Sequence, residues 1–90
     1  MNEQQILEEL LALLEANNVT IRHEALGGAA GGLCTIKGQY IFFVDSQSSS
    51  VDNAAAAAEA VRKVVNIESI YLRPEIRQYI ESDFNSELKD

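Results

Sequence analysis

The chain contains one cysteine, Cys34, and one histidine, His23, and together they could form a nucleophilic pair. An imidazole beside a thiol favours the thiolate, which is the reactive form. If residues 26–31 form a loop between antiparallel strands, His23 falls opposite Cys34. That strand face is otherwise apolar, however, and a buried cysteine usually behaves as a small hydrophobic residue. We therefore expect Cys34 to be buried and unreactive, and a thiol enzyme built on this pair ranks third among three functional hypotheses.

A glycine-rich segment, residues 27–32, could hold a phosphate group. Gly27 and Gly32 have the spacing of a P-loop, but Leu33-Cys34 stands where that motif has a lysine and a hydroxyl residue. A phosphate loop also leads into a helix whose N-terminus binds the anion, whereas a strand pattern follows here. The sequence favours a structural turn with a positive φ at one or more glycines, and a loop whose backbone meets a ligand is the alternative. The glycines concerned are Gly27, Gly28, Gly31 and Gly32.

The sequence predicts neither a metal site nor a cofactor. His23 and Glu24 begin like the zinc-peptidase motif HExxH, but Gly27 stands where the second histidine is required. The order of helix, hairpin, polar loop and helix resembles the frame of small zinc peptidases. The expected helix at residues 51–65 carries no histidine, so this resemblance implies no site residue here.

Two arginines, Arg73 and Arg77, flank the start of the last expected helix. A positive charge at a helix N-terminus opposes the helix dipole, and a bound anion or a partner's carboxylate would remove that conflict. The plainer interpretation is that the arginines pair with Glu75 and Glu81. A module that binds a small molecule or an anion with the glycine loop and both arginines is the second functional hypothesis.

Hydrophobic periodicity predicts the elements that must position these residues. Helices are expected at 3–17, 51–65 and 74–84, and strands at 19–25, 33–36 and 40–44, with 67–73 as a further strand or an extended link. Asn2 and Ser49 are expected to cap the first two helices, and Pro74 suits the first position of the third. A two-residue turn at Lys37-Gly38 pairs Ile36 with Gln39 and, further along, Leu33 with Phe42.

These elements predict one α+β domain over residues 1–90, with a frayed tail at 85–90 and the order αβββα(β)α. Two layers are expected, in which the first two helices cover an antiparallel sheet of three or four strands and the third lies at an edge. The core face is expected to hold Val19, Ile21, Ala25, Cys34, Ile36, Ile41 and Phe43. The other face is expected to hold Leu33, Tyr40, Phe42 and Val44 beside Thr20, Arg22, Glu24 and Thr35.

Composition restricts the possible partners. The net charge of −7 on 90 residues argues against binding to nucleic acid or to an anionic membrane. No apolar run approaches the roughly 18 residues of a membrane span. An acidic start without a signal pattern and a single cysteine favour a cytoplasmic location.

The leading hypothesis is a small, acidic, non-enzymatic interaction or regulatory domain. A chain this short cannot easily bury all of its apolar residues in one copy, so we expect a homodimer or a complex with another protein. The expected contact residues are Leu33, Tyr40, Phe42, Arg73 and Arg77.

Overall fold

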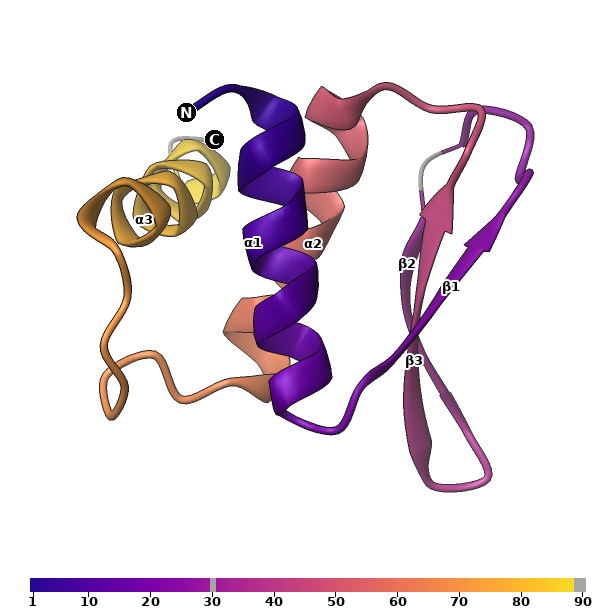
Figure 1. Ribbon diagram of the computed structural model, residues 1–90, viewed down its shortest axis with the longest axis horizontal. Coiled ribbons are helices and arrows are strands. Elements are labelled where there is room, and N and C mark those ends of the chain that lie inside the picture. The colour runs from indigo at the N-terminus through magenta and orange to yellow at the C-terminus, as the bar shows by residue number, and fades with distance from the viewer. Residues whose placement is uncertain (30, 89–90) are drawn as a thin grey trace.

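The computed structural model describes residues 1–29 and 31–88, with side chains at 1–29 and 31–82. The elements follow in the order α1 (Glu3–Ala16), β1 (Thr20–Glu24), β2 (Gly32–Ile36), β3 (Gln39–Asp45), α2 (Ser50–Val64) and α3 (Pro74–Leu88) (Figure 1). The predicted α+β class is confirmed. Residues 67–73 form no strand. α3 is longer than expected and includes residues 85–88 of the expected tail, whereas residues 89 and 90 lie outside the described residues. Within the described part of the chain, no helix is both long and apolar enough to cross a bilayer.

The helices begin where the sequence predicts because polar side chains satisfy their first N–H groups. The side chain of Asn2 accepts a hydrogen bond from the N–H of Gln5, whose side chain accepts one from Asn2 in return. The hydroxyl of Ser49 accepts the N–H of Asp52 at the start of α2. Such caps replace the bonds that the first turn of a helix lacks. Asn18, directly after α1, has a φ of 66°, as expected for a left-handed helix end.

The sheet is mixed, with β3 in the centre and the strand order β1-β3-β2. β2 and β3 form the expected antiparallel hairpin, in which Leu33 lies opposite Phe42, and the turn residues Lys37 and Gly38 have positive φ. β1 runs parallel to β3 and does not touch β2, so the expected all-antiparallel sheet is confirmed only in part. The loop at residues 25–31 is long enough to carry the chain past the end of β3 to its other side.

The assignment of the two sheet faces was right for the first strand, where Val19 and Ile21 lie on the core side, and wrong for β2 and β3. Phe42 has no exposed surface and Val44 is buried, so this side of β3 faces the helices. Ile21, aligned with Phe42, is half-buried on the same side. The neighbouring residues Ile41 and Phe43 face the other way. Because residues 40–44 are apolar throughout, their alternation does not reveal which side of the strand is covered.

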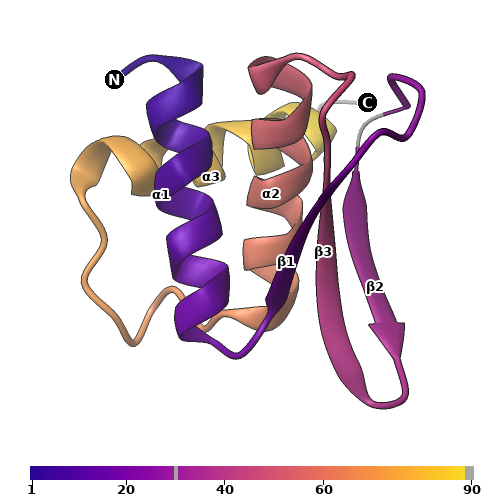
Figure 2. The ribbon, with the colours of Figure 1, turned by 45° about the vertical axis from the view of Figure 1, so that its right-hand side comes forward.

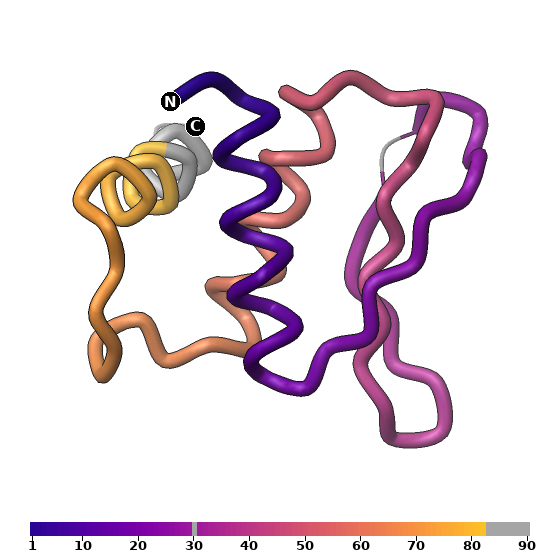
Figure 3. Tube along the Cα trace, in the orientation of Figure 1, coloured from indigo at the N-terminus to yellow at the C-terminus, as the bar shows by residue number. Residues whose placement is uncertain are grey.

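The helices stack on one side of the sheet (Figure 2). α1 and α2 contact the strands, whereas α3 contacts only α1 and α2 among the described elements, on the side away from the sheet. The two-layer packing is therefore confirmed in part, and α3 forms a third layer, not an edge. The Cα trace in Figure 3 shows the hairpin turn projecting beyond the helices. The largest fully buried side chains of the core are Leu10, Leu14, Phe42, Val61 and Ile80.

Two kinds of constraint act on the glycine loop. Gly27 and Gly28 have φ values of 79° and 82°, which confirms the predicted positive φ. Gly31 has an ordinary φ but lies against β3, and a Cβ atom there would stand 1.5 Å from the carbonyl oxygen of Phe43. At Gly32 a Cβ atom would meet nothing within 4 Å.

These adjacent glycines provide a matched pair of substitutions. Gly31→Ala should lower the free energy of unfolding by about 1–3 kcal/mol or more, because backbone must move to admit the methyl group. Gly32→Ala should change it by less than about 0.5 kcal/mol. Urea unfolding followed by circular dichroism measures both, and equal effects would show that the loop does not approach β3 as described.

Candidate functional site

Asp45, at the end of β3, organises the glycine loop. Its Oδ1 accepts the N–H groups of Leu26 and Gln47, both at 2.9 Å, and its Oδ2 accepts the hydroxyl of Ser48 at 2.8 Å. The side chain of Gln47 accepts the N–H of Gly27 at 2.7 Å. The loop therefore directs these N–H groups to side chains of the protein itself. In a phosphate-binding loop the same groups would point at the ligand.

The fully buried carboxyl group of Asp45 has a perturbed pKa. Burial by itself raises this pKa, because the charged form loses its water. Hydrogen bonds from the N–H groups of Leu26, Gln47 and Gly28 and from the hydroxyl of Ser48 act in the opposite direction. Together they lower the pKa of Asp45 from 3.8 to about 2, so the group is a carboxylate at neutral pH.

The main chain of Asp45 is fixed as firmly as its side chain. Its N–H donates to Oδ1 of Asn53 at 3.0 Å, and Nδ2 of Asn53 donates to its carbonyl at 2.8 Å. Asn53 is a buried residue of α2, so this amide joins β3 to the helix that follows. Sequence analysis did not identify either residue as central. The available signal was an aspartate directly between an apolar strand and a serine-rich turn, where its oxygens accept nearby N–H groups.

The proposed nucleophilic pair does not form. His23 is aligned with Val44 in the parallel ladder, whereas Cys34 lies opposite Ile41 on the far side of β3. The expectation that Cys34 is buried was also wrong, because it is an exposed free thiol. Among the described residues, no three histidine, cysteine or carboxylate side chains are grouped closely enough to hold a metal ion.

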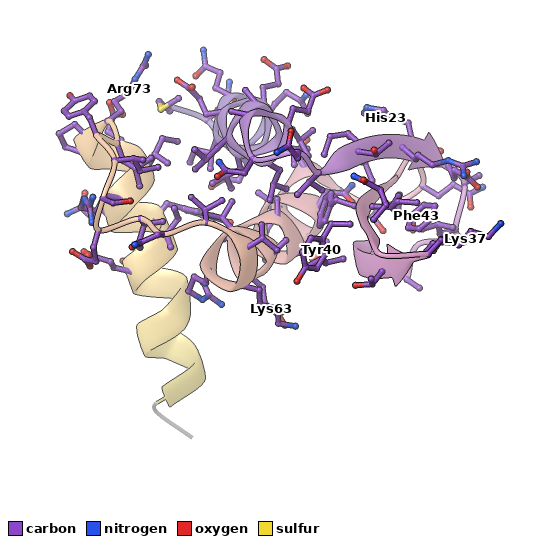
Figure 4. All side chains as sticks on the ribbon, turned by 90° about the horizontal axis from the view of Figure 1, so that it is seen from below. His23, Lys37, Tyr40, Phe43, Lys63 and Arg73 are labelled. Carbon is purple, nitrogen blue, oxygen red and sulfur yellow. The ribbon has the colours of Figure 1, made fainter. Side chains whose placement is uncertain are left out.

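Arg73 and Arg77 are engaged within the molecule. Arg73 lies 3.1 Å from a carboxylate oxygen of Glu9. Arg77 donates to the carbonyl of Ile67 at 2.7 Å and lies 4.0 Å from Glu81. Figure 4 shows Arg73 at the end of the molecule opposite to the strands. The arginines and the glycine loop, combined in the second hypothesis, are therefore not brought together.

The expected contact residues on the hairpin have unequal access to solvent. Phe42 is fully buried and Leu33 is half-buried against the core, because both face the helices. The expectation that Phe42 offers its side chain to a partner is therefore wrong. Tyr40, near the projecting turn, is 44% exposed.

The side of the sheet that faces away from the helices also carries apolar residues, and we call it the open face. Ile36 is 46% exposed, and Cys34 lies beside it on β2. The open face consists of Thr20, Arg22, Glu24, Cys34, Ile36, Ile41 and Phe43. No described helix contacts it, since α1 and α2 cover the opposite side (Figures 1 and 2).

Two charged side chains of β1 border the apolar part of the open face. The guanidinium carbon of Arg22 lies 5.7 Å from the centre of the Phe43 ring, within the range of a cation–π contact. The same guanidinium lies 2.6 Å from a carboxylate oxygen of Glu24. This arrangement holds the guanidinium group of Arg22 over the aromatic ring, at the border of the apolar surface.

Charge is divided unequally between the sheet and the helices. The sheet segment, residues 17–48, contains Arg22, Lys37, Glu24 and Asp45, so its formal charge is zero. The formal charge of −7 therefore comes from the rest of the chain. In the described residues these acidic side chains lie on the three helices and in the link between α2 and α3. The open face is consequently the surface on which charge repulsion is weakest.

Asp45→Asn tests the carboxylate network. The pKa of Asp45 is lower in the folded chain than in the unfolded one, so its contribution to stability is complete above about pH 4 and is lost as the pH falls toward 2. The variant should be less stable than the wild type at pH 7, and the gap should narrow between about pH 4 and pH 2. Urea midpoints measured across this range give the difference. A gap that does not vary with pH would contradict an ionised Asp45.

The chain has no counterpart in the comparisons with known proteins. No family model, no curated protein and no solved structure matches it. The exposed surfaces and the chemistry of the described residues are therefore the basis for assigning a function.

Proposed function

We propose that the chain is a small interaction domain that associates with a second copy of itself through the open face. The observation that carries this proposal is an apolar, charge-balanced sheet face without a helix on it, in a chain whose net charge is −7. A binding role is favoured over a catalytic one because Cys34 and His23 lie on opposite sides of β3. We also propose a cytoplasmic location, where reducing conditions keep an exposed thiol such as Cys34 free.

Charge favours a second copy as the occupant. A two-fold contact brings the same surface of both copies together, so that surface must be compatible with itself. The open face meets this condition, because Arg22 and Glu24 balance each other and can exchange partners across the axis. The acidic helices of both copies then point away from the contact into solvent. A different protein with an apolar surface would also fit this face, but the charges of the face do not favour such a protein over a second copy.

The size of the open face indicates a contact of moderate strength. Three strands of five to seven residues cover about 14 Å by 20 Å at standard strand spacing. A stable interface usually buries about 800 Å² on each partner. The open face alone is smaller, so we expect an affinity in the micromolar range.

Replacing one open-face residue by a charged residue should separate the copies. Ile36→Glu would bring a carboxylate into the apolar contact, where its desolvation is costly. In sedimentation at tens of micromolar, the wild type should have about twice the 9.9 kDa mass of the chain, and Ile36→Glu should have the mass of one chain. Ile36 is already 46% exposed, so the fold should tolerate the substitution.

Val51→Glu is the matched control. Val51 is an exposed aliphatic residue in the first turn of α2, where a negative charge suits the helix dipole. This variant has the same change in charge and should sediment like the wild type. A wild type that remains a single chain at these concentrations would contradict the proposal. Equal dissociation of both variants would show that net charge, and not the open face, determines association.

A further inference from the structure

We propose that the outer edge of β1 and the groove beside α1 form a second docking site, which binds an extended basic peptide segment as an additional strand. This site lies at a different surface from the open face and does not depend on self-association. Three observations lead to it: the free hydrogen-bonding groups of β1, a cleft next to them, and the charges that line this cleft.

Among the described residues, β1 is an edge strand, and its outward peptide groups have no hydrogen-bond partner there. It pairs only with β3, and the carbonyl of Glu24 accepts the N–H of Ser46, which follows β3. Alternate residues of a strand point their N–H and C=O groups to opposite sides, so Ile21 and His23 direct theirs away from β3. No hydrogen bond to these peptide groups is found among the described residues. An edge of this kind is a template for strand addition.

A cleft of about 450 Å³ lies between α1 and the carboxyl end of the strands. Leu7, Leu11 and Val44 provide its apolar part, and His23 lines it from β1. Figure 4 shows His23 at the outer rim of the sheet, on the side of α1. The cleft and the free edge are therefore adjacent, because the same residue, His23, belongs to both.

The charges of the cleft are negative. Glu8 and Glu15 line it from α1 and are separated by seven residues, or about 10 Å along the helix. Neither has a basic partner within the part of the chain that the structure describes. Glu8 is held in place, because Gln4 donates to its carboxylate at 3.0 Å and in turn accepts the hydroxyl of Ser50 at 2.7 Å.

An extended segment with lysine or arginine at alternate positions fits these features. Side chains on one face of an added strand repeat every ~7 Å. Those on the helix side would lie over the cleft, with their alkyl stems against Leu7 and Leu11 and their charges near Glu8 and Glu15. A second copy fits this edge less well, because pairing β1 with β1 would bring two acidic α1 helices together. The occupant is therefore assigned as a basic peptide.

Binding can be followed by nuclear magnetic resonance with a capped peptide of alternating lysine and valine at low salt. The amide signals of Ile21 and His23 should shift, and their hydrogen exchange should slow, because both N–H groups become bonded. A matched peptide with glutamate in place of lysine should not bind. Absence of protection at Ile21 and His23 would overturn the proposal. Protection that rises with protein concentration alone would also overturn it, because a second copy would then occupy the edge.

Two double variants with equal changes in net charge test the role of the cleft. Glu8→Gln with Glu15→Gln should weaken binding of the lysine peptide about ten-fold. Glu59→Gln with Glu68→Gln, which are exposed and lie outside the cleft, should change it by less than about two-fold. Equal weakening by both pairs would show attraction to the net charge alone and would overturn the assignment of the groove.

Discussion

One residue, Asp45, holds the end of the sheet together through hydrogen bonds of both its side chain and its main chain. The carboxylate gathers the glycine loop and the turn after β3, while the main chain of the same residue is bonded to Asn53 of α2. The glycine loop, whose Leu26 precedes Asp45 by 19 residues, is thereby fixed at one end of the sheet against the turn and the start of α2. This arrangement places the start of α2 beside the end of β3. From there α2 packs with α1 on a single face of the strands, and the other face stays open.

This one-sided packing has a consequence for charge. A thin domain with a net charge of −7 keeps its acidic groups on the helices, where water solvates them, and leaves a neutral sheet segment. Exposed charges more than about 8 Å apart are largely screened at physiological salt. The acidic helices would therefore oppose the proposed contact at the open face only weakly, and α1 would attract the proposed basic peptide at the groove beside it. The two proposed docking surfaces follow from the same separation of charge.

Local signals predicted local structure well. The Lys37-Gly38 turn determined the register of the hairpin, and side chains such as Asn2 and Ser49 marked the starts of helices. The position of β1 was not predictable in this way. A hairpin-like connection after β1 favours a neighbouring antiparallel strand, whereas the ladders show that the chain passes the end of β3, where Asp45 holds the loop through the N–H of Leu26. Because β3 lies between β1 and β2, Cys34 and His23 are not neighbours, as they would be if β1 paired with β2.

The strand sequence also could not predict which face of the sheet is buried, because Ile41, Phe42, Phe43 and Val44 place apolar side chains on both faces. What decides between them is the packing of α1 and α2. Tertiary packing, and not the strand sequence, therefore determines that Phe42 lies in the core and that the half-buried Phe43 lies on the open face. The candidate contact surface therefore contains Ile36, Ile41 and Phe43, and not the expected Leu33 and Phe42.

The reactivity of Cys34 reports whether the open face is covered in solution, because this thiol is the chain's single cysteine and lies on that face. The rate of its modification by a small disulfide reagent can be measured per thiol from submicromolar to high micromolar protein concentration. If two copies cover the open face, the rate should fall as concentration rises, and Ile36→Glu should abolish this dependence. A rate that is independent of concentration in the wild type would contradict self-association through the open face.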